Sequence, residues 1–239
     1  MQTEFINIAS HEMKTPTQAI LGYSNLIQRH PEKRDEMLQA ISRNATRLQR
    51  LTSDILDVTR IESKSLNLTL ERFNLNELMS YVVDDYRNEI EKSNSDVKLL
   101  YEPQNEIIQL EADKNRLGQV ISNLLGNAIK FTKKGTIRVT GEIKDSKVLV
   151  SVNDTGQGID PEIMSQLFSK FVARSERGTG LGLFISKSVI EAHGGKIWGK
   201  NNDYDANTRG ATFTFSLPLV RQGKSETGTG TAAGDASKL

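Results

Sequence analysis

The 239-residue chain contains no cysteine, which excludes disulfides, Cys-ligated metal sites and thiol catalysis and fits a reducing compartment. The chain also lacks a large excess of charge of either sign, because 31 Lys and Arg balance 30 Asp and Glu. The overall charge therefore favours neither nucleic acid nor an anionic membrane as a partner. No segment approaches the roughly 18 consecutive apolar residues that a membrane span needs. We expect a soluble piece that binds its partners through local sites.

The two ends of the chain carry different patterns. An amphipathic pattern is already running at Phe5, Ile8 and Ala9, so we expect upstream sequence in the natural protein. Residues 225–239 are rich in Gly, Ser, Thr and Ala and contain no aromatic residue. Such a segment buries too little surface to offset its ordering entropy, and we expect residues 221–239 to form a disordered tail.

Helical periodicity dominates residues 1–62. Pro31 divides them into two helices, and the apolar side chains of the second recur at steps of three, four or seven residues, namely Met37, Ile41, Leu48, Leu51, Ile55 and Val58. A lone hairpin of two such helices cannot cover its apolar stripe. A second hairpin from another copy of the chain is the simplest partner that would cover it, which predicts a homodimer with a four-helix bundle. The alternative is a two-helix arm folded back on the rest of the chain.

A mixed region follows a polar connector at residues 63–72. We expect helices over residues 76–92, 114–132, 161–168 and 181–193, and strands over residues 97–101, 136–143, 147–153, 196–199 and 211–218. Adjacent strands suggest antiparallel pairing, so the expected fold class is a helical hairpin followed by an α+β sandwich, one sheet covered by helices. The predicted domains are residues 1–66, residues 67–220 and the tail.

The segment ASHEMKTPTQAI, residues 9–20, places a reactive side chain on the first helix. His11 alone could be an ordinary surface residue. Glu12 follows it directly, however, and can orient or deprotonate the imidazole if the two rotamers cooperate, while Thr15 lies on the same helix face. Pro16 removes a backbone donor and predicts a local kink. Because a free imidazole is largely neutral at pH 7, the pattern favours His11 as a nucleophile.

A second polar pattern lies in DKNRLGQVISNLLGNAIKFTKKG, residues 113–135. Asn123, Asn127 and Lys130 follow at i, i+4 and i+7 and share one face of an otherwise apolar helix. Amide oxygens suit Mg²⁺, which keeps water and substrate phosphates as its other ligands, and Lys130 can reach a phosphate. The alternative is a merely solvated polar face, which the poor helix propensity of asparagine makes less attractive.

Two glycine-containing segments are further candidates for a binding site, VNDTGQGI at residues 152–159 and RGTGLGLFISKSVI at residues 177–190. In the first, Asp154 ends a strand and can accept a hydrogen bond from an exocyclic amine, and the following glycines let a base approach the backbone. In the second, three glycines lead into an apolar helix whose N-terminal amides favour a phosphate. Each segment alone is weak evidence, because glycine turns are common.

The segments SHEMKTP, NLLGNAIKFT, DTGQGI, LFSKF and GTGLGL, in this order and spacing, resemble the phosphoacceptor and ATP-binding boxes of the sensor histidine kinases of two-component signalling. The resemblance covers residues 4 to about 220. It implies a dimerisation and His-phosphotransfer hairpin followed by the ATPase fold shared with DNA gyrase, the Hsp90 chaperones and the MutL repair proteins. It also implies ATP and Mg²⁺ as cofactors, a response regulator receiver domain as partner and a cytoplasmic location, whether alone or as part of a membrane receptor.

Roles for individual residues follow from this resemblance. It implies His11 as the phosphoacceptor, Glu12 as the general base and Thr15 as the residue that positions water for dephosphorylating a partner. It implies Asn127 as the Mg²⁺ ligand. The remaining implied nucleotide contacts are Asn123, Lys130, Phe131, Asp154, Gly156, Gly158, Gly178, Thr179, Gly180, Leu181, Gly182 and Thr212, with Asp154 reading adenine and Thr212 supplying a hydroxyl near it.

Departures from the family pattern are few. Met13-Lys14 stands where Leu-Arg is usual, and Thr17 replaces the usual apolar residue after the proline, which predicts looser packing below the site. The polar stretch at residues 169–178 resembles the flexible cover over ATP, and Arg174 or Arg177 in it is as readily a solvated residue as a γ-phosphate contact. Two other functions stay open, an ATP-dependent conformational clamp of the same nucleotide fold and a catalytically silent signalling scaffold.

Overall fold

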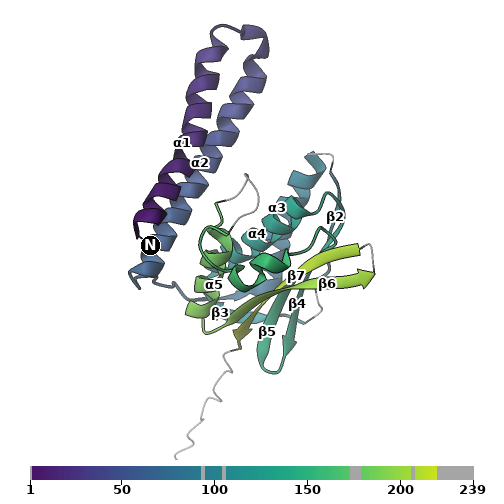
Figure 1. The fold of residues 1–239 in the computed structure, drawn as a ribbon. Coiled ribbons are helices and arrows are strands. Elements are labelled where there is room, and N and C mark those ends of the chain that lie inside the picture. Colours follow the sequence, from purple (N-terminus) through teal and green to yellow (C-terminus); the bar gives the residue numbers. More distant parts are fainter. Residues whose placement is uncertain (1, 93–94, 104–105, 173–178, 206–207, 220–239) are drawn as a thin grey trace, which may run out of the picture.

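The computed structural model describes residues 2–92, 95–103, 106–172, 179–205 and 208–219. A long helical hairpin precedes an α/β sandwich in which helices cover a β-sheet (Figure 1). This arrangement confirms the predicted fold class of a helical hairpin followed by an α+β sandwich. Within the described residues, no helix combines the length and the apolar character needed to cross a membrane.

The hairpin consists of α1 (Gln2–Ile27) and α2 (Arg34–Glu62), joined by a short 3-10 turn at Pro31–Lys33. The helix break at Pro31 is therefore confirmed. Ala9 of α1 and Met37 and Leu51 of α2 are buried, and Val58 of α2 is buried in the same hydrophobic cluster as the core of the sandwich. The other apolar residues of the predicted stripe in α2, Ile41, Leu48 and Ile55, are only half-buried, so the hairpin by itself leaves part of its apolar surface uncovered.

Five strands form the main sheet in the order β2-β4-β5-β7-β6. Their bounds are β2 Asp96–Tyr101, β4 Lys134–Lys144, β5 Lys147–Asp154, β6 Lys196–Asp205 and β7 Thr208–Pro218. The predicted antiparallel pairing holds for β4–β5, β5–β7 and β6–β7, whereas β2 pairs with β4 in parallel. A parallel pair needs a long crossover, and here the chain from β2 to β4 passes through a further strand and a helix.

The helices α3 (Leu75–Lys92), α4 (Lys114–Phe131) and α5 (Gly182–Ala192) pack on one face of this sheet (Figure 1). Alternate residues of β5, including Val150 and Val152, point into the buried core beneath them. The expected helix at residues 161–168 is instead a 3-10 segment, Pro161–Gln166. Proline in its first turn is compatible with such a short helical segment.

A second, two-stranded sheet was not predicted. β1 (Glu71–Asn74) pairs antiparallel with β3 (Gln109–Ala112), with Phe73 opposite Leu110. β1 lies at the end of the expected connector, and four residues with a single buried apolar side chain give little strand signal. The pairing joins the connector to the start of α4.

Asp113 fixes the start of α4. Its carboxylate accepts hydrogen bonds from the backbone N–H of Arg116 at 3.0 Å, as an N-cap, and from that of Thr69 at 2.9 Å. Burial raises the pKa of Asp113, but these two backbone hydrogen bonds, together with the charges of Arg116 and His193, lower the pKa overall. One side chain therefore ties the connector after the hairpin to the helix that carries the predicted nucleotide residues.

Candidate functional site

His11 lies on α1 with its imidazole 80% exposed. Its Nδ1 is 4.0 Å from Oε1 of Glu12, so the two neighbouring side chains face each other without forming a hydrogen bond. The other carboxylate oxygen of Glu12 accepts a hydrogen bond from Nη2 of Arg47 on α2 at 3.1 Å. Arg47 was not predicted, and it holds Glu12 with one oxygen directed at His11.

Thr15 and Thr17 differ in what their hydroxyls do. The Thr17 hydroxyl donates to the carbonyl oxygen of Met13 at 2.8 Å, and the Thr17 side chain is exposed. That Thr17 loosens the packing below the site stays a prediction. Thr15 is also exposed, and its hydroxyl has no hydrogen-bond partner among the described residues. α1 continues through Pro16, which is buried between these two threonines.

The predicted polar residues of α4 lie on one face, half-buried. Asn123 donates through Nδ2 to the carbonyl oxygen of Gly182 at 3.3 Å and to the hydroxyl of Ser186 at 3.4 Å, so it braces the start of α5. Asn127, one turn later, has no hydrogen-bond partner for its carboxamide within the described part of the chain. The Lys130 ammonium lies 5.0 Å from the centre of the Phe131 ring.

Asp154, at the end of β5, is buried with 4% of its surface exposed. Its Oδ1 accepts backbone hydrogen bonds from Gly156 at 2.8 Å and from Ala211 at 3.3 Å. Burial raises the pKa of Asp154, and these two hydrogen bonds only partly oppose the shift. The described residues supply partners to Oδ1 alone, which leaves Oδ2 as the acceptor for a ligand amine.

The turn after Asp154 requires glycine at Gly156. A Cβ there would lie 2.5 Å from the carbonyl oxygen of Phe131, so the end of α4 and this turn pack backbone to backbone. The turn is held further by Asn201 of β6, whose carboxamide bonds both the N–H and the carbonyl of Ile159, at 2.6 and 2.8 Å. No local signal marked Asn201, because its partner lies 42 positions away.

The structure describes the segment before α5 from Thr179 onward. The Thr179 hydroxyl accepts from the N–H of Leu181 and donates to Oδ2 of Asp54 on α2, both at 3.2 Å. Gly180 has φ +69°, and a Cβ there would come within 2.7 Å of the Phe171 backbone. Gly178, Arg174, Arg177 and the tail at residues 221–239 lie outside the described residues.

Thr212 lies on the other side of the sheet from Asp154. It pairs with Asn153 in the register of β5 and β7, and successive residues of a strand point to opposite faces. Its hydroxyl accepts from Asn153 at 2.8 Å and donates to Asn202 at 2.7 Å. The backbone of Ala211, not the side chain of Thr212, contacts Asp154. A hydroxyl of Thr212 beside adenine stays a prediction that this placement does not favour.

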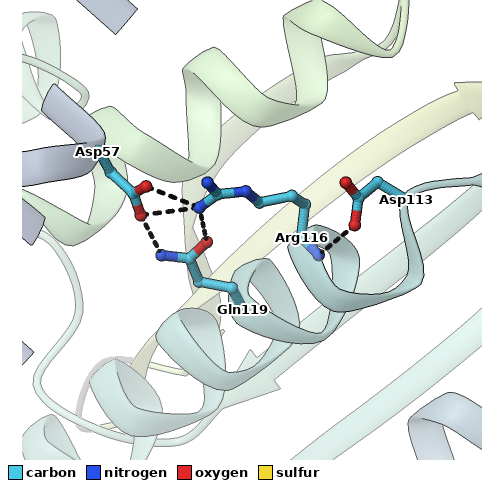
Figure 2. A network of polar contacts seen from close by, with 4 residues as sticks. All are labelled: Asp57, Asp113, Arg116 and Gln119. Carbon is cyan, nitrogen blue, oxygen red and sulfur yellow. Dashed lines mark hydrogen bonds and ion pairs between the residues drawn. The ribbon is translucent and has the colours of Figure 1, made fainter. Parts of the chain in front are cut away.

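Two buried aspartates on α2 contact the sandwich, and neither was predicted. Asp57 bonds Arg116 and Gln119 of α4, in a network that Figure 2 shows together with Asp113. Burial is the main cause that raises the pKa of Asp54 to about 6, with nearby Asp57 adding to it and Thr179 and Arg50 opposing it. Their partners are 59 or more positions away in sequence, so no local pattern could indicate them.

Comparison with known proteins matches both parts of the chain. Residues 1–64 match the His Kinase A (phospho-acceptor) domain, and residues 112–221 match the family described as histidine kinase-, DNA gyrase B- and HSP90-like ATPase. The catalytic domain of histidine kinase ThkA is 39% identical, with 63% of this chain and 96% of that one covered and a TM-score of 0.55. The chain belongs to the sensor histidine kinases.

Other relatives agree with this assignment. The sensor protein SrrB of Staphylococcus aureus strain N315 is 32% identical over 229 residues, which is 91% of this chain and 38% of SrrB. The structure of ThkA in complex with response regulator protein TrrA is 33% identical, covers 91% of this chain and 61% of that one, and has a TM-score of 0.67. This kinase chain therefore spans well under half the length of the curated relative. Its ATPase match implies ATP binding.

The other two histidines of this kinase chain occupy different settings. His193 caps the end of α5, as predicted: its Nδ1 donates to the carbonyl of Val189 at 2.8 Å and its Nε2 accepts from the N–H of Asp113 at 3.0 Å. Both of its ring nitrogens are thereby occupied. His30 is exposed at the turn of the hairpin, with Nδ1 3.3 Å from a carboxylate oxygen of Glu32.

Proposed function

We propose that this chain transfers the γ-phosphoryl group of ATP to a ring nitrogen of His11 and then from His11 to an aspartate of a separate receiver protein. The observation that carries the proposal is the exposed His11 imidazole with the Glu12 carboxylate beside its Nδ1, in a chain that also holds a histidine kinase ATPase match. Transfer to an aspartate is supported by the relative ThkA, which was solved with a response regulator.

The proposed step forms a nitrogen–phosphorus bond and breaks the bond from the γ-phosphorus to the bridging oxygen, so ADP leaves. Glu12 lies on the Nδ1 side of the ring, which leaves Nε2 as the nitrogen that faces the phosphoryl group. Arg47 holds the second oxygen of Glu12 and keeps the carboxylate oriented for the proton on Nδ1. Most of the catalysis comes from positioning and charge neutralisation, as in phosphoryl transfer generally.

On the nucleotide side, Asp154 would accept the exocyclic amine of adenine through Oδ2. Asn127 fits as a ligand of Mg²⁺, because its carboxamide has no partner among the described residues and lies on the same face of α4 as Lys130. Mg²⁺, when bound, would neutralise phosphate charge. Asn123 would support the site indirectly, through its hydrogen bonds to the start of α5.

The experiment that tests the function is incubation with Mg²⁺ and γ-labelled ATP, followed by acid and base treatment of the labelled protein. We expect a label that is lost in acid and retained in base, as for phosphohistidine. A clamp of the same nucleotide fold would hydrolyse ATP without becoming labelled, and a silent scaffold would do neither. The match of residues 1–64 to a phospho-acceptor domain disfavours both alternatives.

The Thr15 side chain is expected to be needed for dephosphorylation of the receiver and much less for kinase activity. Thr15→Ala should keep most autophosphorylation and transfer to the receiver, yet lose dephosphorylation of the receiver by at least about tenfold, since a water-orienting group contributes about 10² to 10⁴. The free hydroxyl of Thr15 on the His11 face of α1 is the reason. The measurement is decay of the phosphorylated receiver with each variant.

Two controls accompany this prediction. Thr15→Ser keeps a hydroxyl and should restore dephosphorylation, whereas Thr17→Ala removes a hydroxyl that only bonds the backbone and should leave both directions near their normal rates. Equal loss of kinase and phosphatase activity in Thr15→Ala would make Thr15 a structural residue.

A homodimer is proposed from the uncovered face of the hairpin. A groove of about 550 Å³ runs along it between α1 and α2, lined by Ile20, Leu48 and Leu56 with small and polar neighbours. Leu56 is 54% exposed and Leu21 is 60% exposed. A second hairpin laid on this face would bury these side chains and complete a four-helix bundle.

Leu56→Asp is expected to weaken this dimer strongly. Burying one leucine is worth about 1.5 to 3 kcal/mol, and a twofold-symmetric dimer contains the side chain twice, so the dissociation constant should rise more than about a hundredfold. Sedimentation equilibrium measures it. Leu70→Asp is the matched control, because Leu70 is 55% exposed in the connector and lies outside the groove. An equal effect of both variants would argue against the groove as the interface.

A further inference from the structure

The main sheet has one face covered by helices and a second face that points away from them (Figure 1). Successive residues of a strand point to opposite faces, so the residues that alternate with the buried core belong to the second face. Val150 and Val152 of β5 lie in the core, and Ser151 between them therefore points away from the helices. We call this second face the open face, and it comprises residues 96, 98 and 100 of β2, even-numbered residues 134–144 of β4, odd-numbered residues 147–153 of β5, even-numbered residues 210–218 of β7 and even-numbered residues 196–202 of β6.

Positive charge is concentrated on the open face. One cation there, Lys134, lies 3.8 Å from the carboxylate of Asp96, and Glu142 is the other carboxylate of this face among the described residues. Seven cations therefore face two carboxylates, although the charges of the whole chain nearly cancel. Six of the cations are exposed and form no ion pair with any described residue, namely Lys98, Arg138, Lys144, Lys147, Lys196 and Lys200.

Protection of the sheet edges explains only some of these cations. Lysine on an edge strand commonly prevents pairing with another chain, which accounts for the cations of β2 and β6. The strands β4 and β5 lie inside the sheet, and there Lys144 and Lys147 stand directly opposite each other. Like charges in that position are destabilising. A partner that brings negative charge to this face would offset the repulsion.

An exposed indole ring accompanies the cations. Trp198 of β6 is 39% exposed, and Lys196 and Lys200 flank it at two positions before and after on the same face. Tryptophan favours the boundary between lipid and water, because its ring is apolar and its N–H needs a polar partner. Lysine stems can cover apolar surface while their ammonium groups stay at the level of the lipid headgroups.

The spread of the charges separates the possible partners. Adjacent strands lie about 4.8 Å apart, so cations on both edge strands span about 19 Å. An extended acidic peptide covers little more than the width of one strand, whereas a bilayer presents negative charge over the whole width. A single-stranded nucleic acid binds through several aromatic rings that stack on successive bases, and Trp198 is the one aromatic residue of the open face among the described side chains.

We propose that the open face binds an anionic lipid bilayer, with Trp198 at the level of the headgroups and the six unpaired cations against the lipid phosphates and carboxylates. Each lysine or arginine near such a surface adds to the attraction. Asp154 of the predicted nucleotide site belongs to the helix-covered face, since it alternates with Asn153 on β5. Binding of lipid should therefore leave the dissociation constant of ATP unchanged.

The test uses sedimentation of the whole chain with vesicles of phosphatidylcholine and phosphatidylserine, and with vesicles of phosphatidylcholine alone. We expect binding to the anionic vesicles only, and its loss near 1 M salt, where the screening length falls to about 3 Å. Lys144→Gln combined with Lys147→Gln should weaken binding roughly twentyfold, or about fivefold for each cation removed. The thermal unfolding midpoint of this variant should not fall, because the substitutions remove a repulsion.

Lys92→Gln combined with Lys114→Gln is the matched control. It removes the same charge from exposed positions of α3 and α4, the helices on the covered face, and should leave vesicle binding nearly unchanged. An equal loss in both double variants would show a general attraction of charge and would overturn the open face as the binding surface.

Trp198 supplies a second readout, because it is the only tryptophan of the chain. We expect its fluorescence to shift to shorter wavelength with anionic vesicles and to be quenched when these contain brominated phosphatidylcholine. Vesicle binding without this shift and quenching would place the contact elsewhere and overturn the proposal. Failure to bind the anionic vesicles, including the case in which a labelled single-stranded oligonucleotide binds instead, would also overturn it. Neither readout involves phosphorylation, so the outcome is independent of the proposed kinase function.

Discussion

His11→Gln is expected to abolish autophosphorylation and to leave the dissociation constant of ATP nearly unchanged. Glutamine offers no nucleophilic ring nitrogen, whereas the ATPase match begins at residue 112, far along the chain from the acceptor. His11 is 80% exposed, so α1 should fold normally. Labelling with γ-labelled ATP and equilibrium binding of ATP measure the two quantities.

His30→Gln is the matched control for this experiment. His30 is also an exposed histidine of the hairpin beside a carboxylate, that of Glu32, but it lies at the turn. We expect normal labelling of His30→Gln and also of His193→Gln, because both ring nitrogens of His193 are occupied by hydrogen bonds. Label that persists in His11→Gln and disappears in His30→Gln would move the acceptor to the turn.

Asp154→Asn is expected to weaken ATP binding about ten- to a hundredfold. A hydrogen bond to a charged, buried acceptor is worth about 1.5 to 3 kcal/mol. Asparagine can still accept the N–H groups of Gly156 and Ala211 through Oδ1, so the turn should persist. Its Nδ2 then replaces Oδ2 and presents a donor to the exocyclic amine of adenine, which is also a donor. Isothermal titration with ATP measures the loss.

Two further variants test whether the effect of Asp154→Asn is specific to adenine recognition. Asp145→Asn removes a carboxylate from the exposed turn between β4 and β5, where φ is +50° and asparagine is well tolerated, and it should not alter ATP affinity. Asn127→Asp should lower Mg²⁺-dependent turnover more than affinity for the base, which separates metal positioning from adenine recognition. An unchanged dissociation constant in Asp154→Asn would remove Asp154 from the nucleotide site.

Much of the fold could be predicted because its signals are local. The apolar stripe of α2, the break at Pro31 and the alternation in β5 each depend on residues within a few positions of one another. The short strand β1 could not, since four residues with one buried side chain become a strand only by pairing with β3. The parallel pairing of β2 with β4 likewise depends on where α4 packs, which strand patterns do not encode.

The sequence by itself was enough to indicate the family, through the order and spacing of the motifs that contain His11, Asn127 and Asp154. The chemistry of these three side chains follows from their residue types and can be inferred without the tertiary structure. Tertiary structure decided which groups meet across long separations. The strand register places the Thr212 hydroxyl on the face opposite Asp154, and docking brings Asp57 to Arg116 across 59 positions. Such pairings depend on how whole helices and strands pack, because a polar residue on a regular helix does not specify its distant partner.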